Sequence, residues 1–142
     1  MYDYNCIIKR VIDGDTVVVD IDLGFDIWIR DEVVRLDGID APELRTSDPE
    51  EKKFGEYSKK YVENLLKIDQ EYILISKDFR NGKYGRCLGD FKIEDQMLTE
   101  IMLADHVAVL YREGLYAKEF MESDHSDNRK ALIEKGVTFD NP

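Results

Sequence analysis

The first forty residues restrict the fold of this chain most strongly, because apolar and polar side chains alternate along them between short turns. Residues 4–12 are typical of one strand, and residues 16–23 alternate branched apolar residues with aspartates. Between them lies Asp13-Gly14-Asp15, where glycine supplies positive φ and aspartate caps its own backbone. After a second turn at Gly24 the alternation resumes over residues 25–30. Three strands joined by short turns predict an antiparallel meander.

The remainder of the chain predicts helices and two further strands. Pro49 breaks a polar stretch over residues 44–53, and a helix follows that begins at Glu50 or Phe54 and ends at Lys67. Its predicted buried face has a spacing of three and four residues and consists of Phe54, Tyr57, Tyr61, Leu65 and Ile68. We expect strands at 71–75 and 87–93, a second helix at 96–105, an extended segment at 106–111, a mobile polar segment at 122–127 and a short terminal helix at 128–135.

These elements predict an α+β fold with a mainly β core. Five strands, interrupted by one helix and followed by others, fit a small β-barrel with helices packed against it, and a closed barrel leaves no sheet edge in search of a partner. The 142 residues form one domain, 1–142, which is long enough for a proper core.

Composition limits the class of partner and the compartment. A net charge of −11 argues against a sequence-independent coat on nucleic acid, but it is compatible with an enzyme that grips one phosphate locally. We interpret Cys6 and Cys87 as buried or half-buried free thiols. No apolar run reaches membrane-spanning length and the first residues do not form a signal peptide. We therefore expect no membrane partner, and a cytoplasmic or phage-encoded protein in a bacterial host, although a mature secreted form would look the same.

Two aspartates make a candidate cation site. Asp15 follows the first turn and Asp40 ends the strand that begins near Val34, so a small barrel can bring both together. Two carboxylates, a nearby backbone carbonyl and waters form a hard oxygen site that suits calcium at about 2.3–2.6 Å. Zinc is disfavoured, because neither His106 nor His125 has a partner at ligand spacing. The alternative is that Asp15 only helps to form the turn.

Two arginines are candidates for phosphate binding. Arg35 lies on a strand end and Arg86 follows a turn that contains two glycines. A guanidinium is a planar fork that binds phosphate through two hydrogen bonds and keeps its proton. Each arginine taken alone is equally compatible with a surface ion pair.

A third acidic residue, Glu43, lies three residues after Asp40, with Pro42 fixing the direction of the chain between them. Its carboxylate can hold a water beside a metal-bound phosphate and accept the proton of that water. It can equally accept backbone N–H groups and stiffen the loop that follows. Lys83 and Tyr84 lie on the glycine turn, where they can contact a phosphate or a nucleotide edge, or only solvent and the turn itself.

Three motifs, in this order, resemble the staphylococcal nuclease family. They are Ile12-Asp13-Gly14-Asp15-Thr16, the stretch from Arg35-Leu36 to Asp40-Ala41-Pro42-Glu43, and Lys83-Tyr84-Gly85-Arg86-Cys87-Leu88, with the predicted helix at 54–67 between the last two. The resemblance covers residues 7–111 and implies an OB-fold, a five-stranded β-barrel with three helices. It implies hydrolysis of DNA and RNA phosphodiesters, as an endonuclease or exonuclease of the thermonuclease type that leaves 3′-phosphate ends.

The resemblance also implies a role for each matched residue. Asp15 and Asp40 would hold calcium with the main-chain carbonyl of Ala41, where many relatives have threonine. Arg35 and Arg86 would bind the scissile phosphate and Glu43 would be the general base, while Lys83 and Tyr84 would hold the nucleotide.

Two departures from the family pattern concern the nucleotide and the charge. The family's nucleotide-contacting tyrosines fall on Arg112 and Gly114 here, which leaves Tyr111 or Tyr116 as a substitute. The well-known member is basic, whereas this chain is acidic. We expect a monomer that acts on nucleic acid. The alternative is a non-catalytic nuclease-like module that binds nucleic acid or a partner protein. Catalysis is favoured because the chain retains the residues Asp15, Arg35, Asp40, Glu43 and Arg86.

Overall fold

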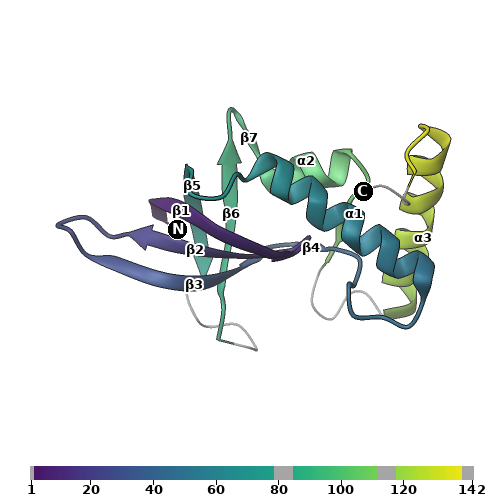
Figure 1. Ribbon diagram of the computed structural model, residues 1–142, viewed down its shortest axis with the longest axis horizontal. Coiled ribbons are helices and arrows are strands. Elements are labelled where there is room, and N and C mark those ends of the chain that lie inside the picture. The colour runs from purple at the N-terminus through teal and green to yellow at the C-terminus, as the bar shows by residue number, and fades with distance from the viewer. Residues whose placement is uncertain (1, 79–84, 112–117, 139–142) are drawn as a thin grey trace.

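A computed structural model describes residues 2–78, 85–111 and 118–138, with side chains in the last segment described from Asp124 onward. Figure 1 shows a strongly twisted sheet with helices at one end. In chain order the elements are β1 (Tyr2–Asp13), β2 (Thr16–Asp22), β3 (Trp28–Leu36), β4 (Ile39–Asp40), α1 (Pro49–Leu65), β5 (Glu71–Asp78), β6 (Cys87–Ile93), β7 (Gln96–Met97), α2 (Leu98–Ala104), β8 (Val109–Leu110) and α3 (Lys118–Glu134).

Five of these strands close into a barrel. They are hydrogen-bonded in the order β3-β2-β1-β5-β6, and β6 pairs back onto β3. The closing pair is parallel, with Val34, Arg35 and Leu36 opposite Cys87, Leu88 and Gly89, whereas the other pairs in the barrel are antiparallel. The predicted five-stranded barrel with three helices is confirmed, and its parallel closing pair makes the barrel mixed.

The barrel interior is filled by branched and aromatic side chains from all five strands and from the helices. Its fully buried members include Ile8, Val19, Leu36, Leu74 and Phe91. Both cysteines are free and buried in this core, as predicted. Burial raises the pKa of the Cys6 thiol to about 12, so this thiol stays protonated and unreactive.

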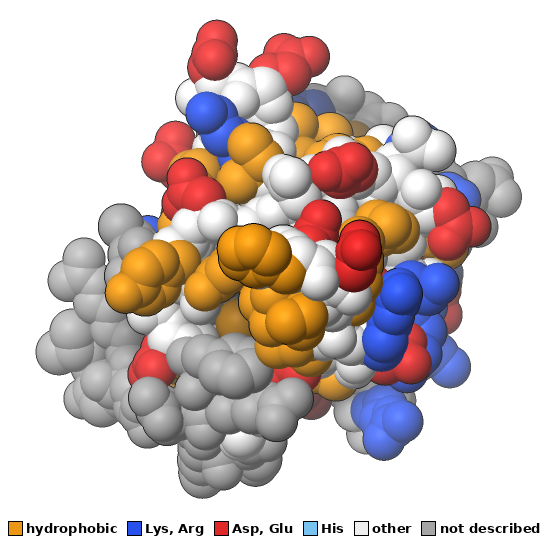
Figure 2. All heavy atoms as spheres, turned by 90° about the vertical axis from the view of Figure 1, so that its left-hand side faces the viewer, with side chains coloured by type: hydrophobic (Ala, Val, Ile, Leu, Met, Phe, Trp, Pro, Cys, Tyr) orange, Lys and Arg blue, Asp and Glu red, His pale blue; other side chains and the backbone are white. Residues whose placement is uncertain are grey.

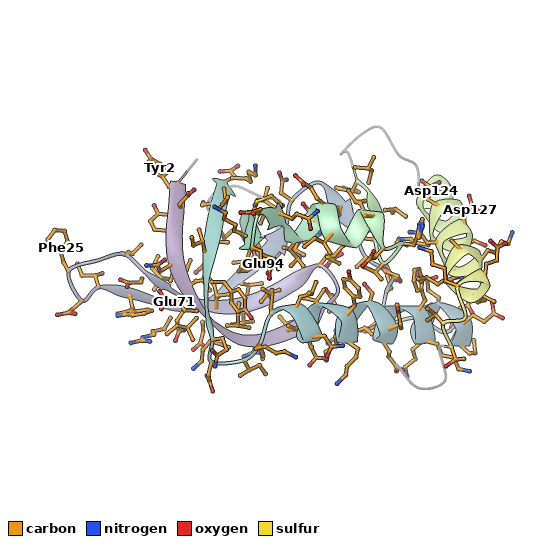
Figure 3. All side chains as sticks on the ribbon, turned by 90° about the horizontal axis from the view of Figure 1, so that it is seen from above. Tyr2, Phe25, Glu71, Glu94, Asp124 and Asp127 are labelled. Atoms are coloured by element: carbon orange, nitrogen blue, oxygen red, sulfur yellow. The ribbon has the colours of Figure 1, made fainter. Side chains whose placement is uncertain are left out.

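The hairpin between β2 and β3 projects away from the helices (Figures 1 and 3). Its tip has positive φ at Gly24, Phe25 and Asp26, and Phe25 is 99% exposed. Leu23, the last residue of the strand predicted at 16–23, is exposed because β2 ends at Asp22 and the hairpin leaves the barrel there. Figure 2 shows hydrophobic side chains gathered at this end, where the exposed set is Tyr2, Leu23, Phe25 and Ile27.

Helix α1 differs from the prediction at its start and on its buried face. Pro49 is the first residue of the helix, one position before the earlier of the two predicted starts. Proline suits this position because the first helical N–H has no partner within the helix, and Asp48 accepts the N–H of Glu50. The buried positions are Phe54, Gly55, Ser58 and Val62. The tyrosines predicted on this face are only half-buried, and Ile68 lies beyond the helix and is 52% exposed.

The smaller residues occupy the centre of the face because α1 packs very closely on neighbouring backbone. A Cβ built on Gly55 would lie 2.6 Å from the Glu43 carbonyl oxygen, and one on Gly14 would lie 2.4 Å from Ser58 Oγ. Only small residues allow this approach, which periodicity of large apolar residues does not reveal.

The C-terminal segment also corrects the prediction. Residues 122–127, predicted to be mobile, are part of the 17-residue helix α3, in which His125 and Leu132 are buried. Asn128 Nδ2 donates to the Ala108 carbonyl (3.0 Å), and Arg129 pairs with Glu51 of α1. These contacts supply the stabilisation that the local sequence lacks, since most helices depend on tertiary packing.

The second predicted helix is shorter than expected. Gln96 and Met97 pair with β6 as β7, and α2 covers residues 98–104 and ends before His106, which has positive φ. The predicted extended segment at 106–111 contains β8, which pairs with β4 beside the barrel. This small sheet fixes one edge of the candidate site.

Candidate functional site

Asp15 lies at the turn between β1 and β2 and is only 9% exposed. The Ala41 N–H donates to its Oδ2 and the Thr16 hydroxyl donates to its Oδ1, both at 3.0 Å. The Asp15 carbonyl accepts the Leu36 N–H (2.8 Å), which ties this turn to β3. The predicted turn residue is therefore buried, with its carboxylate held by Thr16 and Ala41 and its main chain held by Leu36.

Asp40 reaches the same place from β4. Ile39 and Asp40 pair with Leu110 and Val109 of β8, and the Tyr111 N–H donates to the Gly38 carbonyl (2.9 Å). Gly38 has φ of 79°, a conformation that glycine adopts without strain and that lets the chain reverse between β3 and β4. The sequence analysis predicted that Asp40 ends the strand that begins near Val34. That strand, β3, ends at Leu36 instead, and Asp40 ends the separate strand β4, whose place is fixed by β8.

Arg35 stands between the two carboxylates. Its Nη2 lies 3.5 Å from Asp15 Oδ2 and 3.6 Å from Asp40 Oδ1, and its Nη1 donates to the Leu36 carbonyl (2.8 Å). The guanidinium carbon lies 6.0 Å from the centre of the Tyr111 ring, within cation–π range. The side chain is 14% exposed, so a cation and two acidic groups meet in a largely buried cluster.

Asp13 and Asp15 have opposite pKa shifts. Burial, and then the hydrogen bond and charge of Asp15, raise the pKa of Asp13 to about 7. Burial also acts to raise the pKa of Asp15, but the Arg35 charge and hydrogen bonds from Asp13, Ala41 and Thr16 bring it below its ordinary value. Asp15 is the ionised member of the pair, and Asp13 is the member that keeps a proton near neutrality.

Close packing joins the acidic cluster to α1. The Cβ that would be added at Gly14 meets the Ala41 side chain at 2.7 Å as well as Ser58, whose hydroxyl donates to the Val107 carbonyl (2.8 Å). The small residues on α1, Gly55 and Ser58, were not singled out by the sequence analysis. A weak signal existed, since Gly55 and Ser58 are three residues apart and therefore share one helix face.

Glu43 is exposed, although it directly follows the buried residues Ala41 and Pro42. Its main-chain carbonyl is held against Gly55 of α1, so the backbone is positioned while the side chain faces solvent. A carboxylate that protrudes from a fixed backbone at the edge of the cluster is accessible to water.

The phosphate and nucleotide candidates are described only in part. Arg86 is half-buried and immediately precedes β6, two positions before Leu88, which pairs with Arg35. The parallel closing pair therefore brings the backbones of both arginines to one region of the barrel. Lys83, Tyr84 and Tyr116, like Arg112 and Gly114, lie outside the described residues.

His125 was considered in the sequence only as a zinc ligand, yet the structure brings it to the site. Its Nε2 lies 3.0 Å from Asp40 Oδ2, and its ring packs edge-on against Phe54 with centroids 6.1 Å apart. No sequence signal links His125 to Asp40, because 85 residues separate them and the contact depends on how α3 docks.

The donor set fits a hard divalent cation. Within the described part of the chain, no three His, Cys, Asp or Glu side chains form a metal-binding group. A calcium site built from Asp15, Asp40 and a main-chain carbonyl needs only two such side chains, however. Both carboxylates already turn toward one positively charged nitrogen.

Within the described residues no helix is long and apolar enough to span a membrane.

Comparisons with known proteins place this geometry in context. The family model described as "Staphylococcal nuclease homologue" matches residues 33–137. A protein named thermonuclease from Staphylococcus intermedius is 32% identical to this chain over 133 residues, which cover 91% of this chain and 67% of that protein. The matched regions include Arg35, Asp40, Glu43 and Arg86.

Proposed function

Since the chain belongs to the staphylococcal nuclease family, we propose that it is a calcium-dependent phosphodiesterase that hydrolyses DNA and RNA and leaves 3′-phosphate ends. One observation carries the proposal. Asp15 and Asp40, from separate segments, converge on the same Arg35 nitrogen at 3.5 and 3.6 Å. Such a cluster of opposite charges is suited to hold a cation and a phosphate side by side.

In this proposal Asp15, Asp40 and the main-chain carbonyl of Ala41 hold calcium. Bound calcium would offset the negative charge of the scissile phosphate. The charge of Arg35, with hydrogen bonds from Asp13, Ala41 and Thr16, keeps Asp15 ionised, and the last two also orient its carboxylate, so the site is organised in advance. The Ala41 carbonyl is available whichever side chain the residue carries, which makes the departure from threonine compatible with the role.

Arg35 and Arg86 bind the phosphate in this scheme. Arg35 is positioned by the Leu36 carbonyl and by the Tyr111 ring, and its forked donors can exchange carboxylate partners for phosphate oxygens. Because the Tyr111 ring lies beside Arg35, we assign it to the nucleotide side of the site. We assign Lys83 and Tyr84 to nucleotide binding from the motif alone.

Glu43 acts as the general base. Its exposed carboxylate takes a proton from water, the water oxygen forms a bond to phosphorus, and the bond from phosphorus to the 5′ oxygen breaks. The leaving 5′ oxygen takes a proton from solvent, and the phosphate stays on the 3′ oxygen. The fixed backbone beside Gly55 supports this role, since it holds the carboxylate at one place relative to the cluster.

Cleavage of single-stranded DNA and of RNA, measured with calcium and then with excess chelator, tests the proposal. We expect cleavage that the chelator abolishes, and product ends that can be extended only after phosphatase treatment. Arg86→Ala should lower kcat by about 10²–10³-fold, because a donor to developing charge is lost. The matched control is Arg10→Ala, which removes an exposed arginine on β1 and should leave the rate within about twofold.

Full inertness of the folded protein in calcium at alkaline pH would contradict the proposal. Binding of the same oligonucleotides without cleavage would instead support the non-catalytic nuclease-like module.

A further inference from the structure

His125 contacts Asp40, yet the proposed function gives it no role. It is 4% exposed and comes from α3, at the opposite end of the molecule from the Phe25 hairpin tip (Figure 3). Its Nε2 lies 3.0 Å from Asp40 Oδ2. An ionised carboxylate only accepts hydrogen bonds, so Nε2 is the donor in this contact.

The two oxygens of Asp40 therefore have different environments. Oδ2 is occupied by His125, whereas Oδ1 faces Nη2 of Arg35 at 3.6 Å, on the side where Asp15 also turns. The Asp40 side chain is 27% exposed, so packing alone leaves its torsions partly free. A donor on one oxygen fixes the plane of the group and determines which oxygen is left for a ligand.

The histidine is itself held rigidly. The Phe54 ring meets it edge-on at 74°, and the next turn of α3 is tied down by the hydrogen bond from Asn128 to Ala108 and the ion pair of Arg129 with Glu51. Its other ring nitrogen, Nδ1, is buried and finds no partner within the described residues. Within the described residues, Asp40 is therefore the hydrogen-bond partner of this buried imidazole. The contact offsets part of the cost of burying a polar ring.

We propose that His125 is a positioning residue for the cation site: it holds Asp40 through Oδ2 and so presents Oδ1 to calcium. This inference rests on the proposed function, because it assumes that Asp40 is a calcium ligand. Partners that orient metal ligands commonly matter nearly as much as the ligands themselves. It also gives α3 a role, since the helix becomes the support of a ligand and not only a cover for α1.

Calcium titration by calorimetry, followed without substrate, tests the proposal. His125→Phe keeps a ring against Phe54 and removes the donor, and we expect the calcium Kd to rise by about 10-fold or more. His125→Gln places an amide N–H near the position of Nε2, and we expect it to bind calcium within about threefold of the original chain. Such a rescue separates hydrogen bonding from packing.

Arg129→Gln is the matched control, because it loosens α3 from α1 without touching Asp40. It should lower Tm and leave the calcium Kd within about twofold. A His125→Phe protein with an unchanged Kd would overturn the proposal. So would an Arg129→Gln protein that loses as much affinity as His125→Phe, since docking of the helix would then be the whole effect.

If His125→Phe does not fold, His125→Gln and His125→Asn decide the question. The asparagine amide is one methylene too short to reach Oδ2, so weaker calcium binding is expected for asparagine only, and equal binding by the two variants would overturn the inference. An original chain that binds no calcium would overturn the inference together with the proposed function. One that binds calcium and cleaves DNA, but shows no effect of the His125 variants, would overturn the inference alone.

Discussion

At the scale of single residues, the pair formed by Asp13 and Asp15 governs how the site responds to pH. The Asp15 N–H donates to Asp13 Oδ1 (3.0 Å), and both carboxylates are withdrawn from solvent at one turn. Two acids this close do not both ionise readily. Because Arg35 favours the ionised form of Asp15, the proton of the pair stays on Asp13 up to a pH of about 7.

This arrangement predicts a loss of stability as pH rises. The pKa of Asp13 is about 7 in the folded protein against an ordinary 3.8, so the folded state binds the proton more tightly than the unfolded state. The resulting stabilisation is complete below pH 4 and is lost as pH rises through 7. Asp13→Asn imitates the protonated form of Asp13. At pH 8 we expect the free energy of unfolding of this variant to exceed that of the original chain by about 1–2 kcal/mol.

Urea unfolding at several pH values, with chelator present, measures the effect. The exposed Asp3→Asn is the control and should follow the original chain at every pH. The free energy of unfolding of the original chain should therefore fall relative to that of Asp13→Asn between pH 5 and 8. If the two change with pH in the same way, Asp13 does not keep a proton in this range.

At the scale of elements, α1 positions the loop that carries Glu43, because Gly55 has no side chain. Gly55 lies in the middle of the helix, where glycine is usually unfavourable by about 1 kcal/mol relative to alanine. A Cβ there would lie 2.6 Å from the Glu43 carbonyl oxygen and 2.9 Å from its carbonyl carbon. Because both contacts are with backbone, the loop would have to move to accept any larger residue.

Gly55→Ala should therefore destabilise the protein by about 1–3 kcal/mol, against the trend of helix propensity, because overpacking exceeds the gain. Cleavage should fall further than calcium affinity, since the displaced residue is Glu43 while Asp15 and Asp40 are held by other segments. Thermal unfolding measures the loss of stability in Gly55→Ala, and cleavage rates and calcium titration measure the losses of activity and of calcium affinity. Glu56→Ala, at the exposed neighbouring position, is the control. A Gly55→Ala protein with raised Tm and full activity would refute this account of the helix.

At the scale of the whole molecule, the charge of the surface opposes the charge needed at the site. The chain carries a net charge of −11, while the arginine proposed to contact phosphate lies in a local, largely buried cluster. The long-range field of such a protein repels a polyanion, and a nearby guanidinium attracts it only at short distance. The balance between the two depends on screening by salt.

We therefore expect kcat/KM for a single-stranded oligonucleotide to rise, by about twofold or more, between roughly 20 and 150 mM NaCl at saturating calcium. Screening removes the repulsion at distances where the local arginines have little influence. A small phosphodiester with one negative charge is the control substrate and should respond less. A steep fall with salt would mean that a basic surface dominates substrate capture instead.

The local pattern of the sequence was sufficient for the barrel and for the residues on its turns and strand ends. Alternation of side chains and the turn at Gly14 predict the antiparallel meander, and the pairing of β2 with β3 places Arg35 opposite Thr16, next to Asp15. Both features depend on neighbours along one meander. Asp40 comes to the same place through the pairing of β4 with β8, which the local pattern does not contain.

Only the tertiary structure decided which small residues α1 buries, that residues 122–127 are helical, and that His125 reaches Asp40. Each of these depends on packing between segments far apart in the chain. The free energy of such contacts comes from surfaces that exist only after folding, so no local periodicity records them.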